Sequence, residues 1–435
     1  MKPSVGKVRI WRMKAYTNVN LVTCDSAFHV YRDGLLVVED DRIAYCGPYD
    51  ESWLGKCSET VDYEGAWIMP GLVNCHTHSA MTLLRGIRDD SNLHEWLEDY
   101  IWPAESQFTA DLTTEAVQLA LAEMLLSGTT TFNDMYNPQG VEIDRIYQTV
   151  RQSGMRCYFS PTLFSSEAET AEETLDRTRT IIEKILSYDD EDFQVMVAPH
   201  SPYACDEELL KGSLELAREL DLKLHIHVAE TQDENKIILE RYGKRPLAFL
   251  KGLGYLEQPA IFAHGVELNP SEIADLAASP VSIAHNPISN LKLASGVAPV
   301  TDLLAAGVTV GLATDSVASN NNLDMFEEGR TAALLQKMRA GDATQFTIEQ
   351  ALKALTIEGA EALGLDNKIG SLEAGKQADF IVIQPKGRLH LYPLENMLSH
   401  LVYAVKGSDV QDVYIAGQQV VRNGQVLTVD VGNFV

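Results

Sequence analysis

Short apolar runs alternate with amphipathic stretches along most of this chain. From about residue 66 to residue 315, each run is rich in β-branched and aromatic residues, and the segment after it has apolar residues at helical spacing. These runs predict strands at residues 67–74, 129–134, 156–164, 193–199, 223–228, 260–264, 281–285 and 309–313. The clearest helical patterns lie at residues 111–126, 141–153 and 207–219. Eight strands that alternate with helices over about 250 residues predict a parallel (β/α)8 barrel, the TIM barrel of the α/β class.

A doubly wound open sheet is the competing α/β architecture. That fold places a glycine-rich phosphate loop after its first strand and gathers its ligands at one switch point. No such loop follows residues 67–74, and polar residues end many of the predicted strands. The pattern therefore favours the barrel.

Both ends of the chain carry short strands and turns in place of this alternation. We expect strands at residues 5–10, 35–38 and 42–45, and again at residues 379–383, 410–416 and 418–422. Neither end is large enough to enclose a core alone. We therefore predict a small composite β-sandwich built from residues 1–65 and 371–435, with the barrel, residues 66–370, inserted between them.

Composition narrows the classes of function. The chain has 435 residues, 45% of them hydrophobic, and a formal net charge of −27. That negative charge argues against partners such as nucleic acid or anionic membranes and suits an enzyme that acts on small molecules. The six cysteines form no C-x-x-C pair, and no signal peptide or membrane-spanning run is present. We expect a cytoplasmic protein with reduced thiols.

The first predicted barrel strand carries two histidines, His76 and His78, in H-x-H spacing. Residues two apart on a strand point the same way, so both imidazoles can reach one metal ion. Later strand ends, which face the active site of such a barrel, supply His200, His227, His264, His285 and Asp315. Three imidazoles and one carboxylate suit zinc or ferrous iron and leave a position open. We predict His76, His78, His227 and Asp315 as the ligands.

Other candidate ligands are set aside. His225 lies one layer deeper on its strand than His227 and is expected to be a core histidine, and Cys75 is expected to point away from the histidines. His285 fits either the rim or the core. Binuclear sites of this kind bridge their metals with a lysine from a central strand. Lys184, the only lysine between His78 and His200, lies in a helical stretch, so we expect one metal per subunit.

Several motifs in this order resemble the amidohydrolase superfamily, and within it the 5'-methylthioadenosine/S-adenosylhomocysteine deaminases. They are PGLVNCHTH at residues 70–78, MTLLRG at 81–86, PHSPY at 199–203, HVAET at 227–231, AHG at 263–265, HNP at 285–287, SNLK at 289–292, TD at 314–315, SNN at 319–321 and GKQAD at 375–379. The resemblance covers nearly the whole chain. It implies the metal ligands named above, preferably for zinc, and a homo-oligomer.

The resemblance also implies catalytic roles. Glu230, His264 and Asp315 would handle the protons of a hydrolytic deamination, with Glu230 as the acid that protonates the purine ring. A carboxylate just beyond a ligand histidine on a barrel strand has few structural reasons to be there. The implied reaction converts 5'-methylthioadenosine, S-adenosylhomocysteine or adenosine to ammonia and the inosine-type product.

Three substrate contacts follow from the resemblance. Glu105 matches a glutamate that holds the ribose hydroxyls, although it also fits a carboxylate before a helix. His200 matches a histidine that contacts the substrate. Arg156 matches an arginine near the far end of the nucleoside, although it also fits a surface arginine before the third strand.

Other functions stay open at this point. The same barrel could act on guanine, cytosine or an s-triazine, from which the same attack displaces chloride. The zinc deaminase signature H-x-E with P-C-x-x-C is absent, which argues against editing of nucleic acids. A non-catalytic relative would be expected to lack ligands, yet every ligand position here is filled.

Overall fold

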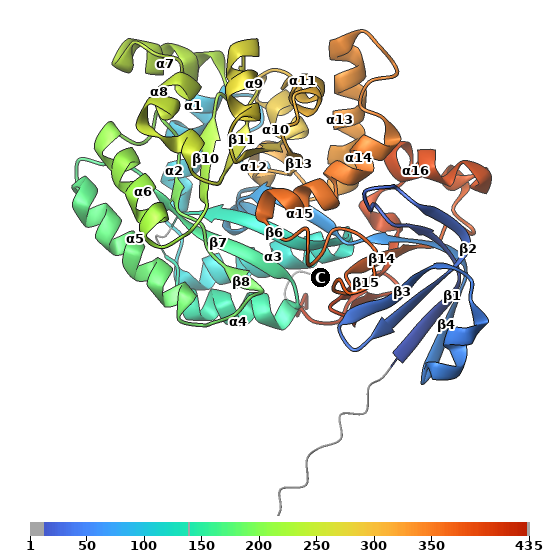
Figure 1. The fold of residues 1–435 in the computed structure, drawn as a ribbon. Coiled ribbons are helices and arrows are strands. Elements are labelled where there is room, and N and C mark those ends of the chain that lie inside the picture. Colours follow the sequence, from blue (N-terminus) through green and yellow to red (C-terminus); the bar gives the residue numbers. More distant parts are fainter. Residues whose placement is uncertain (1–12, 138–139, 433–435) are drawn as a thin grey trace, which may run out of the picture.

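The computed structural model describes residues 13–137 and 140–432. The strand expected at residues 5–10 lies outside these residues. Within them, no helix has both the length and the apolar character needed to cross a membrane. Figure 1 shows helices packed around a central set of strands, with a separate sheet against one side.

Parallel strands form the predicted barrel. They are β5 (Leu72–Thr77), β6 (Thr129–Tyr136), β7 (Arg156–Leu163), β8 (Phe193–Gln194), β9 (Ala198–Pro199), β10 (Leu224–Val228), β11 (Ala260–His264), β12 (Val281–His285) and β13 (Val310–Leu312). Strands β5 to β8 pair in sequence order, β9 pairs with β7, and β10 to β13 pair in sequence order. The fourth predicted strand is thus two short pieces, β8 and β9.

Two parallel bridges close these arcs into a ring. Val197 pairs with Leu224, which joins the fourth strand to β10, and Thr77 pairs with Asp315, which joins β5 to the residues after β13. The barrel prediction is confirmed.

Helices cover the outside of the barrel. The longer ones are α3 (Ala110–Leu126), α4 (Ile143–Ser153), α5 (Ala171–Leu186), α6 (Glu207–Glu219), α7 (Gln232–Tyr242), α8 (Pro246–Leu253), α9 (Pro270–Ala277) and α13 (Met325–Ala340). The shorter ones are α10 (Pro287–Lys292), α11 (Val300–Ala305), α12 (Val317–Asn320), α14 (Ile348–Ala354), α15 (Ile357–Leu363) and α16 (Met397–Tyr403). The three helices predicted most clearly match α3, α4 and α6. Local chemistry sets the bounds: Thr170 and Glu173 form a capping box at the start of α5, and Gly154 ends α4 at φ 82°.

A continuous helical segment packs against Met81 and Leu84, which follow β5 in the sequence. It consists of α1 (Leu93–Trp96), a π-helical turn at Leu97–Ile101 and α2 (Trp102–Glu105). Pro103 has no backbone N–H, so a regular α-helical bond cannot form there. The wider π turn precedes that proline, and π turns are common at functional sites.

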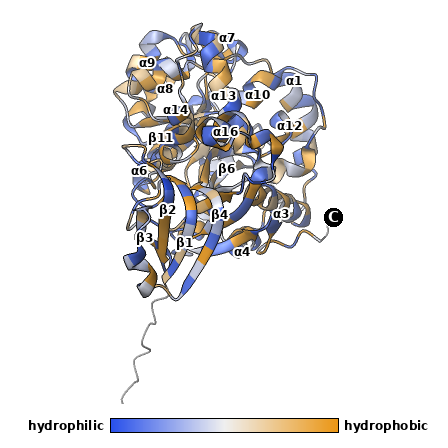
Figure 2. Cartoon of the chain, turned by 90° about the vertical axis from the view of Figure 1, so that its right-hand side faces the viewer, coloured by the Kyte–Doolittle hydropathy of each residue, from blue (hydrophilic) through white to orange (hydrophobic). Residues whose placement is uncertain are grey.

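The two ends of the chain meet in one sheet. In spatial order it runs β17 (Gln425–Val426), β16 (Gln418–Arg422), β15 (Val410–Ile415), β14 (Phe380–Ile383), β4 (Glu59–Pro70), β1 (Met13–Val22), β2 (Val30–Glu39) and β3 (Arg42–Pro48). Arg42 of β3 also bridges Gln377, close before β14, so the sheet curls back on itself. Figure 2 shows hydrophilic and hydrophobic positions mixed along β1, β2 and β4, as in strands with one buried face. The predicted pairing of the two ends is confirmed.

Two strand predictions need correction here. The sequence analysis missed β1, whose alternation is interrupted by shifts in its register with β2 between Tyr16 and Leu21. It also placed residues 67–70 in the barrel, whereas they end β4 and the barrel begins at Leu72. Gly71 permits this crossing, because a Cβ there would lie 2.3 Å from Oγ1 of Thr130. Residues 66–70 of β4 and all of β5 are buried, so the apolar run continues across the boundary without a break.

Arg156 joins the barrel to this sheet and does not reach the active site. It is the first residue of β7, at the end of the strand opposite the active-site end, and its side chain is 2% exposed. Its guanidinium donates to Asp192 at 2.9 Å and also to Gln377 and Asp379. The prediction that Arg156 contacts the substrate is therefore wrong. These partners bind its guanidinium at the end of the barrel opposite the active site.

Removing this cation tests its structural role. We expect Arg156→Met to lower the free energy of unfolding by about 3–5 kcal/mol, because it leaves the carboxylate of Asp379 buried without its partner. Arg179→Met is the control, since Arg179 pairs with Glu219 on the surface and is expected to cost at most about 1 kcal/mol. Denaturant unfolding measures both. Equal, small effects would contradict the role assigned to Arg156.

Candidate metal centre and active site

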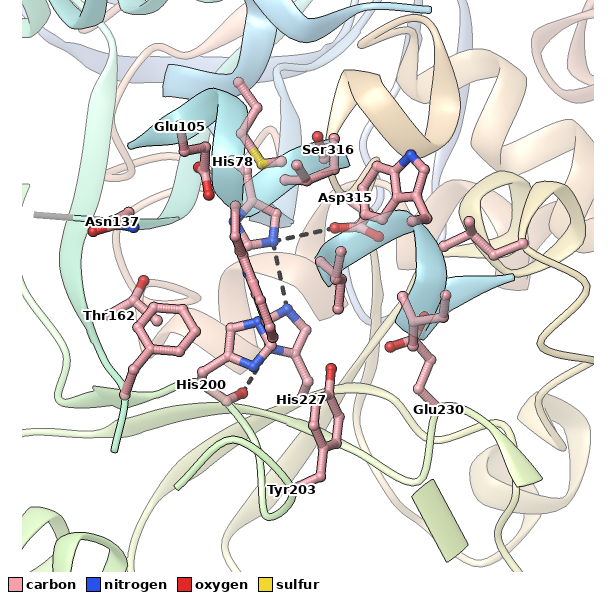
Figure 3. A pocket seen from close by; sticks show the side chains of 18 of the residues that line it. His78, Glu105, Asn137, Thr162, His200, Tyr203, His227, Glu230, Asp315 and Ser316 are labelled. Carbon is pink, nitrogen blue, oxygen red and sulfur yellow. Dashed lines mark hydrogen bonds and ion pairs between the residues drawn. The ribbon is translucent and has the colours of Figure 1, made fainter. Parts of the chain in front are cut away.

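The four predicted metal ligands converge at the carboxyl ends of three barrel strands. His76 lies in β5 with His78 just after it, His227 lies in β10, and Asp315 follows β13. Oδ1 of Asp315 is 3.3 Å from Nε2 of His76 and 3.2 Å from Nε2 of His78. Nε2 of His78 is 3.4 Å from Nε2 of His227, and Figure 3 shows these rings facing Asp315. The structure thus brings all four donors together.

Backbone carbonyls orient two of the imidazoles. Nδ1 of His78 donates to the carbonyl of Met135 at 2.6 Å, and Nδ1 of His227 donates to the carbonyl of His200 at 2.6 Å. A carbonyl oxygen only accepts, so the proton of each neutral ring sits on Nδ1. Nε2 of each ring then keeps a free lone pair, as a metal ligand requires.

His76 is oriented by a second histidine. Its Nδ1 lies 2.8 Å from Nε2 of His225, which occupies the deeper layer as predicted. Its own Nε2 is buried and has no hydrogen-bond partner among the described residues. A buried nitrogen without a partner costs free energy unless something binds it, so this atom fits a metal ion.

Asp315 is held as the anion of the cluster. Its Oδ2 accepts hydrogen bonds from Ser289 at 2.6 Å and Ser319 at 3.1 Å, which turns Oδ1 towards the histidines. Burial alone would raise the pKa of Asp315, but the rings of His76 and His78 beside its Oδ1 hold it well below its usual value. Both serines lie in motifs that are visible in the sequence, at residues 289–292 and 319–321, but the sequence alone does not reveal their role.

His264, the last residue of β11, is the fifth member of this cluster. One ligand atom from each of His76, His227, His264 and Asp315 lies within 4.8 Å of the others. Nδ1 of His264 faces the side-chain amides of Asn290 at 2.9 Å and Asn286 at 3.2 Å. These amides donate to Nδ1, so Nε2 carries the proton and can donate towards the cluster. His264 is therefore better suited to donate a hydrogen bond than to bind a metal ion.

Glu230 lies beside His264. The two side chains are buried, with Oε2 of Glu230 3.7 Å from Nε2 of His264. Burial raises the pKa of Glu230 well above its usual value, and the charges of Asp315 and Glu234 raise it further. Its Oε1 has no hydrogen-bond partner among the described residues. A carboxyl group in this environment keeps its proton near neutral pH and can act as an acid.

These groups open into one pocket with about 530 Å³ of space. It is lined by His78, Met81, Leu93, Trp96, Leu97, Ile101, Trp102, Glu105, Asn137, Thr162, Phe164, His200, Tyr203, His227, Glu230, His264, Leu293, Asp315 and Ser316. Figure 3 shows Glu105, Asn137 and Thr162 on one side of the cluster and Glu230 on the other. Apolar and aromatic side chains with a few converging polar groups are typical of a small-molecule site.

Glu105 and His200 thus reach the same pocket as the cluster. Burial raises the pKa of Glu105 to about 7, although the charge of His78 works against this shift. Burial lowers the pKa of His200 to about 3, helped by the charges of His78 and His76, so its ring is neutral. The sequence analysis did not identify the aromatic wall. Trp102 and Tyr203 stand beside residues it named, but a sequence does not show which way an aromatic side chain points.

Two residues set aside earlier lie away from the ligands. Lys184 is on α5 and pairs with Asp144 at 2.9 Å. His285 is 1% exposed, and neither of its ring nitrogens has a hydrogen-bond partner among the described residues. His285 therefore belongs to the core.

The profile of the amidohydrolase family matches residues 67–420. The chain belongs to the amidohydrolase family. This amidohydrolase is a hydrolase of carbon–nitrogen bonds, as the motifs predicted, and its buried cluster suits a divalent metal ion.

Two curated relatives of this amidohydrolase carry the same name, 5-methylthioadenosine/S-adenosylhomocysteine deaminase. The one from Bacillus cytotoxicus is 47% identical over 96% of this chain and 95% of its own length. The one from Bacillus cereus is 48% identical over 95% of each chain. Among solved structures, an adenosine deaminase from Xanthomonas campestris with bound zinc is 35% identical, with a TM-score of 0.89 over 97% of this chain and 95% of that one.

Proposed function

We propose that this amidohydrolase catalyses the hydrolytic deamination of adenine nucleosides: 5'-methylthioadenosine, S-adenosylhomocysteine and adenosine. The observation that carries the proposal is Glu230, a buried carboxyl group with a raised pKa in the same pocket as the three imidazoles and Asp315. Deamination of an adenine needs such an acid, because the ring nitrogen must be protonated while C6 is attacked. The names of the curated relatives support the same reaction.

His76, His78, His227 and Asp315 would hold one divalent ion. Three imidazoles and one carboxylate accept zinc or ferrous iron, and we propose zinc because the Xanthomonas campestris deaminase carries it. When bound, the ion lowers the pKa of water towards about 7 and so supplies a nucleophile at neutral pH. The free Nε2 atoms and the anionic Asp315 support this ligand set.

Three side chains would move the protons. Asp315 accepts one proton from the attacking water, and the Nε2–H of His264 orients that water. Glu230 gives its proton to N1 as the bond to C6 forms. Glu230 then takes the proton of the C6 hydroxyl group and passes it to the departing amine, which leaves as ammonia. The proton on Asp315 restores Glu230 for the next turnover.

Glu105 and His200 would bind the nucleoside. Glu105 lies across the cluster from Glu230, so a purine whose amine faces Glu230 places its ribose towards Glu105. The carboxylate can accept hydrogen bonds from both ribose hydroxyls. The neutral ring of His200 lies next to His227, with ring centroids 4.5 Å apart, and can bond a purine nitrogen. A free base or an s-triazine offers no hydroxyls to Glu105.

We further propose that the predicted domain division of residues 66–370 from residues 1–65 and 371–435 holds once residues 66–70, which belong to β4, are moved to the composite β domain; residues 71–370 then form the catalytic domain. We expect a homo-oligomer in the cytoplasm that has neither nucleic acid nor a membrane as its partner. The negative charge of the chain supports the last point.

The reaction is tested with the zinc-loaded protein and five substrates offered separately. We expect 5'-methylthioadenosine or adenosine to show the ultraviolet change of deamination with one equivalent of ammonia. Guanine and cytosine should stay unchanged, because they have no ribose for Glu105 to hold. S-adenosylhomocysteine is the fifth substrate, and its turnover is measured in the same way. Turnover of a free base with none of the nucleosides would contradict the proposal.

The role of Glu230 is tested by Glu230→Gln. The amide cannot transfer a proton, so we expect kcat to fall by about 10²–10⁴-fold, with metal content unchanged. Glu257→Gln is the control, because Glu257 pairs with Arg218 on the surface. Metal analysis and steady-state kinetics measure both variants. Full activity of Glu230→Gln would contradict its role as the acid.

A further inference from the structure

The wall of the pocket carries no positive side chain to receive an anion. Among the lining residues that the structure describes, none is lysine or arginine. Part of the wall is apolar, with Trp96, Trp102, Phe164 and Leu293 among its members. A charged group placed against such a wall loses water and gains no partner, which costs free energy.

Basic side chains near the lining residues are engaged elsewhere. Lys292, next to Leu293 in the sequence, pairs with Asp89 at 2.8 Å and donates to the carbonyl of Ala318. The guanidinium of Arg88 lies over the ring of Tyr100 at 5.0 Å. Arg156, the one arginine expected near the substrate, is bound at the other end of β7.

The helical segment over the pocket and the five residues before it carry mostly negative charge. Residues 88–105, which include the lining residues of α1 and α2, contain one arginine, Arg88. Their carboxylates are Asp89, Asp90, Glu95, Glu98, Asp99 and Glu105. A substrate carboxylate that reaches out of the pocket past this segment therefore meets like charge.

The position of the 5' group follows from the proposed orientation of the nucleoside. The purine amine faces Glu230 and the ribose faces Glu105, so the 5' substituent leaves the ribose on the side away from Glu230. Figure 3 shows Asn137 and Thr162 on that side. Both side chains are uncharged, and Trp102 lies three residues before Glu105 on α2.

We infer that the pocket selects adenine nucleosides with an uncharged 5' substituent, the class of 5'-methylthioadenosine, and discriminates against the amino-acid tail of S-adenosylhomocysteine. The tail carries a carboxylate and an ammonium group, and the pocket offers the carboxylate no cation. A thioether with a methyl group makes only apolar contacts and needs none. This inference rests on the proposed deaminase function and narrows its substrate.

The test compares kcat/KM of the zinc-loaded protein for four nucleosides: adenosine, 5'-methylthioadenosine, 5'-butylthioadenosine and S-adenosylhomocysteine. The butylthio tail matches the homocysteine tail in chain length but carries no charge, so it separates charge from size. We expect 5'-methylthioadenosine and 5'-butylthioadenosine to agree within about fivefold, and S-adenosylhomocysteine to be at least about tenfold poorer than either.

Three outcomes overturn the inference. A kcat/KM for S-adenosylhomocysteine less than tenfold below that for 5'-methylthioadenosine would show that the tail finds a partner in solution. A 5'-butylthioadenosine as poor as S-adenosylhomocysteine would assign the discrimination to tail length. In both cases the deaminase function stands. No turnover of any of the four nucleosides would overturn the proposed function and this inference together.

Discussion

The closure of the barrel between its first and last strands is the constraint on which the site depends. The backbone N–H of Asp315 donates to the carbonyl of His76 at 3.0 Å, and Thr77 and Asp315 pair as a parallel bridge. This contact places a carboxylate from the end of the ring against two histidines from its beginning. The third histidine, His227, is supplied by β10. Residues up to 239 positions apart in sequence (315 − 76) become one site because the ring closes.

Burial then decides the charge of each group at this rim. His200 and His264 are neutral, because burial lowers the pKa of each to about 3. Glu230 keeps its proton for the same reason, since a buried carboxylate beside another negative charge is unfavourable. Asp315 alone is held as an anion by its neighbours. An anionic Asp315, neutral His200 and His264 and a protonated Glu230 are the protonation states that metal binding and acid catalysis require at neutral pH.

Much of this was predictable from the sequence, and the reasons are local. The H-x-H spacing at His76 could be interpreted because side chains two apart on a strand point the same way, which does not depend on distant contacts. The alternation of apolar runs with amphipathic stretches is also a local pattern. The strand ends then marked His227, His264 and Asp315 as members of one rim. The serines that orient Asp315 could not be assigned, because their direction depends on how α10 and α12 pack beside it.

The errors also have physical causes. Residues 67–70 were assigned to the barrel because burial makes β4 and β5 equally apolar, and only Gly71 marks the change of element. Arg156 was assigned to the substrate by resemblance, yet its place at the start of β7 already put it at the end of the strand opposite the active site. Its partner Asp379 lies 223 residues away, a pairing that no local pattern reveals.

We propose that His76, His78, His227 and Asp315 hold one divalent ion at the closed rim. The most direct test is a crystal structure of the zinc-loaded protein with anomalous data at the zinc edge. We expect one anomalous peak per chain, bound by Nε2 of the three histidines and by Oδ1 of Asp315, with His264 outside the first coordination sphere. Two peaks, or a peak bound without Asp315, would contradict it.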